Sequence, residues 1–245
     1  MPTLFISDLH LDPSRPEITR QFLEFLAGEA RQADALYILG DLFELWIGDD
    51  DPDPDKRRVL EGLRELTDAG VACKFVHGNR DFLIGSGFTR ATGVALIADG
   101  TVVEVAGERV LLMHGDLLCT DDHSYQRLRR IVRNPLVQWL FRHLPLGRRQ
   151  ALAERIRVGS REHTNATPAA IMDVNLDAVR RAFERHRVDL LVHGHTHRPA
   201  VHEHLWPDWR KTTTRIVLGD WFEQGSVLRW GNRGYVLEQL PRPGT

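Results

Sequence analysis

The chain has 245 residues, of which 42% are hydrophobic and 27% charged, and its formal net charge is −2. This length fits one large domain or a core domain with an insertion, and the balanced charge excludes a chain that is polycationic throughout. No apolar stretch approaches the roughly 20 residues that span a bilayer, the N-terminus lacks the basic region of a secretory signal, and the two cysteines form no CxxC pair. We therefore expect a cytoplasmic protein.

Short apolar runs rich in β-branched residues recur along the chain and predict buried strands. They are Thr3–Ser7, Ala35–Leu39, Val71–Val76, Val110–Met113, Leu190–Val192 and Ile216–Leu218. Helical patterns at Ile18–Arg31 and Lys56–Ala69 separate the first three runs. The alternation of strand and helix predicts an α/β layer fold. Two further segments, 101–113 and 226–240, read as β-hairpins, so part of the sheet structure should be antiparallel.

Residues 120–182 interrupt the strand pattern with long helical segments. Within them, residues 123–153 contain seven arginines and no acidic residue. We expect residues 1–119 and 183–245 to form the core and residues 120–182 to form an inserted helical lid.

Five polar clusters stand where predicted strands end. They are Asp8-Leu9-His10, Gly40-Asp41-Leu42-Phe43-Glu44, Gly78-Asn79-Arg80-Asp81, His114-Gly115-Asp116 and Gly194-His195-Thr196-His197. Each cluster alone is weak evidence for a ligand site, because such short groups are more often turns or helix caps. Together they offer oxygen and imidazole donors at strand ends, where ligand sites gather. This donor set suits Mn²⁺, Fe²⁺ or Zn²⁺, and the lack of thiolates argues against a structural zinc cage.

The clusters resemble the pattern of the calcineurin-like metallophosphoesterases, which is DxH, GDxx(D/E), GNH(D/E), H and GHxH. Four blocks match in order, and the third departs because Arg80 stands where the family has histidine. The resemblance implies a four-layer α/β/β/α sandwich with two metal ions. It assigns one metal to Asp8, His10, Asp41 and His197, and the other to Asp41, Asn79, His114 and His195, so that Asp41 would bridge the two.

The residues next to these ligands are expected to have supporting roles. Glu44, Asp81 and Asp116 should orient ligands or stabilise turns. His77 and His193 precede glycines at the ends of apolar strands and should be structural.

Arg80 points to the class of substrate. The family's histidine is expected to protonate an alcohol leaving group, which arginine cannot do because it stays protonated. A phosphate monoester leaves readily without a proton, so an arginine that forks onto phosphate oxygens suits cleavage of a pyrophosphate bond.

A more specific resemblance follows from FISDLHL, YILGDLFELWIGDD, HGNRDFLIG, LLMHGD and HGHTHRPA. These segments are similar to the UDP-2,3-diacylglucosamine hydrolases of lipid A biosynthesis. The resemblance implies Mn²⁺-dependent hydrolysis of UDP-2,3-diacylglucosamine to UMP and 2,3-diacylglucosamine 1-phosphate, by metal-activated hydroxide attack on the α-phosphorus, with two Mn²⁺ per chain. The catalytic residues it implies are Asn79, Arg80 and His114. The residues it implies for substrate binding are Asn79, Arg80, Asp122, Arg157, Ser160, Thr164, Thr167 and His195. At Thr167 the family often has lysine.

The substrate's two acyl chains require an apolar groove and an approach to the cytoplasmic face of the inner membrane, as a peripheral protein. The insertion offers apolar residues interleaved with Arg129, Arg130, Arg133 and Arg142; they are Ile131, Val132, Leu136, Val137, Trp139, Leu140, Phe141 and Leu144. Two interpretations stay open. Either the apolar residues pack on the core with the arginines in water, or exposed apolar and cationic residues together face lipid.

Other functions remain as alternatives. A phosphoesterase of this superfamily could act on soluble dinucleotides, cyclic nucleotides or phosphoproteins, although Arg80 and the insertion argue against it. A scaffold without metals should have lost ligands, and every expected donor is present. A nuclease is disfavoured because no extended basic track with stacking aromatics is evident, so we expect no nucleic-acid partner, and we expect a monomer.

Overall fold

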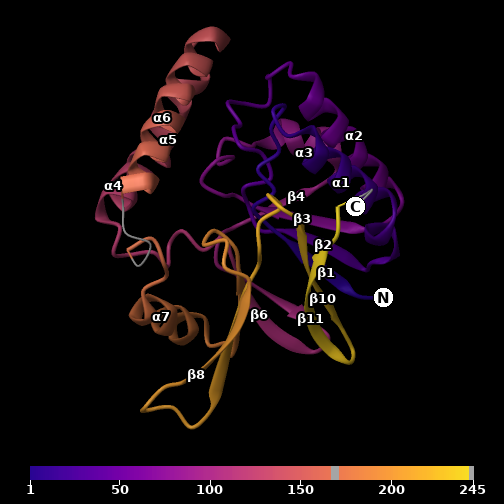
Figure 1. The fold of residues 1–245 in the computed structure, drawn as a ribbon, viewed down its shortest axis with the longest axis vertical. Coiled ribbons are helices and arrows are strands. Elements are labelled where there is room, and N and C mark those ends of the chain that lie inside the picture. The colour runs from indigo at the N-terminus through magenta and orange to yellow at the C-terminus, as the bar shows by residue number, and fades with distance from the viewer. Residues whose placement is uncertain (167–170, 243–245) are drawn as a thin grey trace.

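The computed structural model describes residues 1–166 and 171–242, without the side chains of residues 160–166. Two mixed β-sheets lie against each other, with helices on their outer sides and three further helices standing at one end (Figure 1). This arrangement confirms the α/β layer fold.

The first sheet has six strands in the order β11-β10-β1-β2-β3-β4. Its parallel strands are β1 (Thr3–Ile6), β2 (Ala35–Ile38), β3 (Ala72–Val76) and β4 (Ala95–Ile97). The hairpin of β10 (Gly225–Gly231) and β11 (Gly234–Leu240) adds to the sheet antiparallel to β1.

The second sheet has five strands in the order β5-β6-β7-β9-β8. Its parallel centre consists of β6 (Glu108–Met113), β7 (Leu190–His193) and β9 (Thr212–Val217). The antiparallel edges are β5 (Thr101–Val105) and β8 (Ala200–Leu205). The six predicted strands and both predicted hairpins are therefore confirmed.

Three apolar clusters hold the layers together. The helices α1 (Pro16–Ala27), α2 (Pro54–Asp68) and α3 (Ser86–Thr92) bury residues such as Phe22 and Leu63 against the first sheet, and a short 3₁₀ turn follows at Glu29–Gln32. A second cluster, including Phe5 and Val192, fills the space between the sheets. In a third cluster, Val179 and Phe183 of α7 (Leu176–His186) pack on the second sheet. Three clusters between four layers make the α/β/β/α sandwich.

The inserted segment supplies α4 (His123–Val132), α5 (Pro135–Arg142) and α6 (Leu146–Ala166). In Figure 1, α6 is a long rod that extends beside the helices of the first sheet. The next helix, α7, crosses the expected boundary at residue 182 but belongs with the packed layers, because its apolar face contacts the second sheet. The exact division into core and lid stays a prediction, and the word lid below refers to α4, α5 and α6.

Candidate active site

The predicted ligands come together where strands of both sheets end. Asp8 and His10 follow β1, Asp41 follows β2, and Asn79 follows β3, all in the first sheet. The second sheet contributes His114 after β6 and the segment 194–197 after β7. The carboxyl ends of parallel strands meet at one edge of a sheet, and here two such edges adjoin.

The backbone at these strand ends is strained. Seven non-glycine residues have a positive φ among those described, and five of them are predicted ligands: Asp8, His10, Asp41, His195 and His197. This left-handed region is unfavourable for side chains other than glycine, and such strain clusters at functional sites. The surrounding packing therefore holds the ligand loops in conformations that they would not choose alone.

Two glycines allow the ligand loops to approach one another. A Cβ added to Gly78 would lie 2.1 Å from Oδ1 of Asp41, and one added to Gly194 would lie 2.2 Å from Oδ2 of Asp8. Real carbon and oxygen atoms cannot come this close, so only glycine fits at either position.

Asp8, His10 and His197 form the first metal-binding group, with one ligand atom of each within 4.8 Å of the others. The Nε2 atoms of His10 and His197 face each other at 3.3 Å, and Nε2 of His197 lies 3.4 Å from Oδ1 of Asp8. Three donors from two sheets thus converge on one point.

Asp8, Asp41 and His114 form the second group by the same criterion. Nδ1 of His114 donates to the carbonyl of Leu39 at 2.8 Å, which fixes the ring, and Nε2 faces Oδ1 of Asn79 at 2.9 Å. Asn79 is thereby placed beside this group, and its assignment as a ligand stays a prediction.

Two carboxylates lie between the groups. Asp8 belongs to both. Asp41 places Oδ2 3.7 Å from Nε2 of His10 and Oδ1 3.8 Å from Nε2 of His114, so its two oxygens face a histidine of each group. This geometry suits the bridging role expected of Asp41, which stays a prediction together with the division of ligands between the metals.

The site fits divalent cations. Oδ1 of Asp8 is buried and forms no hydrogen bond of good geometry among the described residues, although a buried carboxylate oxygen normally has one; Nε2 of His197 faces it at 3.4 Å. Burial alone would lower the pKa of His114, but the carboxylates of Asp41, Asp116 and Asp8 outweigh it and raise the pKa to about 9. Burial also opposes protonation of His197, but Asp220 and Asp8 raise its pKa to about 10. The surplus of negative charge thus holds protons on the imidazoles, and metal ions would replace them.

His195 lies beside the second group without joining it. Its ring centroid is 5.0 Å from that of His114, and its backbone N–H donates to Oδ2 of Asp8 at 2.9 Å. Burial and the nearby His114 lower the pKa of His195 to about 4, so its imidazole is neutral at pH 7 and able to act as a ligand. Its assignment as a ligand stays a prediction.

Carboxylates orient the histidines of the first group. Oε2 of Glu44 lies 2.9 Å from Nδ1 of His10, and Oδ2 of Asp220 lies 3.3 Å from Nδ1 of His197. Such contacts fix the tautomer and would leave Nε2 free to bind a metal. The role of Glu44 was expected, whereas Asp220 was missed. The signal was present, because Gly219-Asp220 follows the predicted strand Ile216–Leu218 as Gly40-Asp41 follows an earlier one.

The other neighbours stabilise the loops. Asp81 accepts from the backbone N–H groups of Leu42 and Gly78 at 2.8 and 2.9 Å, which ties the second and third clusters together. Asp116 accepts from the hydroxyl of Tyr125 at 2.7 Å and from Nε of Arg129 at 2.6 Å.

The two histidines expected to be structural have structural contacts. Nε2 of His77 donates to the carbonyl of Ile84 at 2.8 Å. Nδ1 of His193 donates to the carbonyl of Gly194 at 2.8 Å, and its Nε2 accepts from Arg215 at 3.1 Å.

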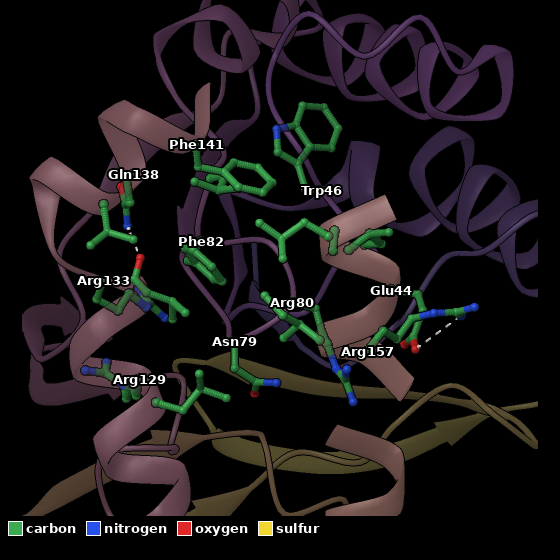
Figure 2. Close-up of a pocket in the computed structure, with 18 of the residues that line it drawn as sticks. Glu44, Trp46, Asn79, Arg80, Phe82, Arg129, Arg133, Gln138, Phe141 and Arg157 are labelled. Atoms are coloured by element: carbon green, nitrogen blue, oxygen red, sulfur yellow. Dashed lines mark hydrogen bonds and ion pairs between the residues drawn. The ribbon is translucent and has the colours of Figure 1, made fainter. Parts of the chain in front are cut away.

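A pocket opens beside the metal-binding groups, between the core and the lid. Asn79, Arg80 and Arg157 lie at one end of it, and Trp46 and Phe141 lie at the other (Figure 2). Nε of Arg80 is buried and has no hydrogen-bond acceptor among the described residues. A buried guanidinium N–H without an acceptor is costly, so this end of the pocket is prepared for an anion.

The walls of the pocket between its ends are mostly apolar. They come from the core through Leu45, Phe82 and Leu83 and from the lid through Leu128, Val132, Val137, Leu152, Ala153 and Ile156. A largely apolar cavity with a few polar groups at one end is typical of a site for an amphiphilic ligand.

Two arginines of the lid, Arg129 and Arg133, reach the core, whereas Arg127 and Arg130 are exposed. Arg129 pairs with the buried Asp116, and Nη2 of Arg133 donates to the carbonyl of Gly78 at 2.8 Å. No residue of α4 or α5 is buried, and Leu136, Trp139 and Leu140 are 53–63% exposed. Each of the two interpretations is therefore met in part. Arg127 and Arg130 are exposed and Phe141 packs against the core, whereas Leu136, Trp139 and Leu140 are exposed. Arg129 and Arg133 turn toward the core because carboxylate and carbonyl acceptors lie there.

The predicted substrate contacts other than Asn79, Arg80 and His195 fall into three classes. Arg157 lines the pocket and pairs with Glu154 at 2.8 Å. Asp122 instead caps α4 by accepting from the N–H of Tyr125 at 2.9 Å, and a contact of Asp122 with substrate stays a prediction. The third class lies outside the described side chains and consists of Ser160, Thr164 and Thr167.

In the described parts of the chain, no helix combines the length and the apolar composition that crossing a membrane requires.

Comparisons with known proteins agree with this geometry. The family model of the calcineurin-like phosphoesterases matches residues 1–199. The chain is 54% identical to a UDP-2,3-diacylglucosamine hydrolase of Escherichia coli O81 (strain ED1a) and 53% identical to one of Shigella boydii serotype 18, over 94% of this chain and 95% of each relative. A structure described as a novel archaeal phosphodiesterase is similar in fold, with a TM-score of 0.50 and 13% identity over 98% of this chain and 100% of that one. The chain therefore belongs to the calcineurin-like phosphoesterases and, within them, to the family of UDP-2,3-diacylglucosamine hydrolases.

Proposed function

We infer that this chain hydrolyses the pyrophosphate bond of UDP-2,3-diacylglucosamine in lipid A biosynthesis, releasing UMP and 2,3-diacylglucosamine 1-phosphate. One observation carries the inference beyond family membership. The apolar pocket ends at Arg80, whose buried Nε lacks an acceptor, directly beside the metal-binding groups. A substrate with acyl chains at one end and a pyrophosphate next to them matches this order of apolar, cationic and metal-binding surfaces.

The residues of the site would have two roles, metal binding and phosphate binding. Asp8, His10, Asp41, Asn79, His114, His195 and His197 would hold two Mn²⁺ ions. When bound, such a pair activates water and neutralises charge on the phosphoryl oxygens. Arg80 would bind pyrophosphate oxygens with its planar fork, and the amide of Asn79 would position one of them. Neither residue needs to donate a proton, since the departing phosphate monoester is a good leaving group.

The surface of the lid supports contact with a membrane. Leu136, Trp139 and Leu140 lie on one side of α5 at i, i+3 and i+4, and His143 contacts Trp139 with ring centroids 4.3 Å apart and the rings tilted. The exposed Arg127 and Arg130 lie on α4, and the exposed Arg142 lies on α5. Exposed apolar residues with cationic neighbours bind anionic lipid, so we infer peripheral attachment at the inner membrane.

The test is product identification by mass after incubation of the purified protein with UDP-2,3-diacylglucosamine and Mn²⁺. We expect UMP and 2,3-diacylglucosamine 1-phosphate, and no product after treatment with a chelator. Efficient cleavage of soluble dinucleotides or simple phosphate esters, with this substrate left intact, would instead support the alternative of a phosphoesterase for soluble substrates.

A further inference from the structure

The long lid helix α6 contacts the core at its first turns through an unusually well-buried arginine. Arg149 is only 3% exposed. Its Nη1 donates to the carbonyl of Ile47 at 3.0 Å and to Oδ1 of Asp50 at 2.7 Å, and its Nη2 pairs with Oδ2 of Asp50. The contact is bidentate, the geometry in which an arginine fixes direction as well as distance.

The loop of residues 47–50, which contacts Arg149, leaves space for its guanidinium. Gly48 has a φ of +145°, and a Cβ there would lie 2.5 Å from Nη1 of Arg149. The loop is itself fixed to the core, because Asp49 accepts from the N–H groups of Gly85 and Gly87 at 3.0 and 2.7 Å. Arg149 is thus anchored to a loop that is hydrogen-bonded to the core, where the guanidinium fills the space that a side chain at Gly48 would occupy.

The position of Arg149 on α6 connects this anchor to the pocket. Ala153, Ile156 and Arg157 follow at i+4, i+7 and i+8 and therefore share its face of the helix. All three line the pocket, and Arg157 lies about 12 Å along the axis from Arg149 at 1.5 Å per residue. Any rotation or tilt of α6 at Arg149 would move this wall of the pocket relative to Asn79 and Arg80.

We propose that Arg149 and Asp50 form a latch that sets the orientation of α6, and through it the width of the apolar pocket and the place of Arg157. The inference rests on the proposed function for the identity of the substrate. Arg149 is a positioning residue in this scheme, since the pocket lining does not include it. Its loss should impair binding of long acyl chains more than it impairs the pyrophosphate chemistry.

The chain provides a matched control. Arg148 is the preceding residue of the same helix turn, is exposed, and makes no side-chain hydrogen bond or ion pair among the described residues. Arg148→Ala removes the same charge and side-chain length as Arg149→Ala. Asp50→Asn is the graded variant, because it removes the ion pair and leaves the bond from Arg149 to the carbonyl of Ile47. Asp50 is 66% exposed, so its ion pair is partly screened and its loss should be milder.

The experiment measures kinetics and amide hydrogen exchange of the full chain with Mn²⁺. For Arg149→Ala we expect KM for the long-chain substrate to rise about tenfold to a hundredfold, the size of effect that small misplacements produce. We expect a smaller change for a short-chain analogue, an intermediate effect for Asp50→Asn and none for Arg148→Ala. Exchange should accelerate in residues 146–159 and stay unchanged in β1, β2 and β7.

Two results would overturn the latch. The first is an equal loss of activity on long- and short-chain substrates with faster exchange throughout the core, which would mean general destabilisation. The second is unchanged exchange in α6. Because exchange requires no substrate, failure of the latch is distinguishable from failure of the proposed function, which would appear as an inactive wild type.

Discussion

The backbone N–H of Arg80 donates a hydrogen bond of 2.8 Å to Oδ1 of Asp41. The residue proposed to hold pyrophosphate oxygens is therefore fixed directly to the residue proposed to bridge the metals. The bond comes from the main chain, so it survives substitution of the Arg80 side chain. This separates the two roles experimentally.

Arg80→Ala should retain metal and lose turnover. The variant keeps the backbone bond to Asp41 and every proposed ligand, but removes the guanidinium that we propose neutralises the phosphate oxygens, so we expect kcat to fall about a hundredfold or more. Arg80→Lys should recover part of the activity, because lysine supplies a point charge without the fork. Metal content by elemental analysis and steady-state kinetics check this, and equal loss of metal would make Arg80 structural.

Asp41→Ala should lose metal and activity together. Its oxygens face His10 and His114, so removal takes a donor from both groups. The control is Asp68→Ala, which removes only an exposed ion pair with Arg64 on α2. Metal content equal to that of the control would contradict the bridging role.

Asp220→Asn tests the carboxylate that the sequence interpretation missed. The amide keeps the size of the side chain but weakens its hold on Nδ1 of His197, and the loss of such partners typically costs 10- to 100-fold in metal affinity or activity. Titration with Mn²⁺ should show the weakened affinity, and saturating metal should restore most of the activity. Activity that stays low at saturating Mn²⁺ would instead place Asp220 in substrate binding.

Binding of Mn²⁺ should release protons and strengthen as pH rises. Without metal, the raised pKa values of His114, about 9, and His197, about 10, keep both imidazoles protonated at pH 7. Ligation requires the neutral form, so about two protons should leave at pH 7 and progressively fewer as pH passes those values. Calorimetry in buffers of different ionisation enthalpy measures this number, and binding with no proton release would show that these imidazoles are already neutral.

The lid's exposed face and its pocket face should be separable by mutation. Serine at Leu136, Trp139 and Leu140 should weaken binding to vesicles that contain anionic phospholipid, with little change in thermal stability because these side chains are exposed. Phe141→Ser should instead raise KM for the long-chain substrate, because Phe141 lines the pocket. Unchanged vesicle binding in the triple variant would remove this surface from the membrane contact.

Most of the fold was predictable because local patterns carry it. The strand at 35–39 and the hairpin at 101–113 were identified from apolar runs and turn residues, since a buried strand needs apolar residues whichever element packs against it. Helix ends were less certain. The pattern at Ile18–Arg31 covers both α1 and the 3₁₀ turn that follows, because the break at Gly28 leaves the apolar spacing almost unchanged.

The sequence by itself predicted the donors of the metal-binding site, because Asp, Asn and His stand at successive strand ends, where ligand sites gather. The structure brings Asp8, His10, Asp41, His114 and His197 together there. Only the tertiary structure decided which partners those donors have and which way the lid faces. Asp220 contacts His197, Arg149 contacts Asp50, and Arg133 contacts the carbonyl of Gly78. Each contact joins two segments that are separated in the sequence and brought together by tertiary packing. Arg129 and Arg133 turn toward the core because carboxylate and carbonyl acceptors lie there, and the periodicity of a helix carries no information about the surface that it meets.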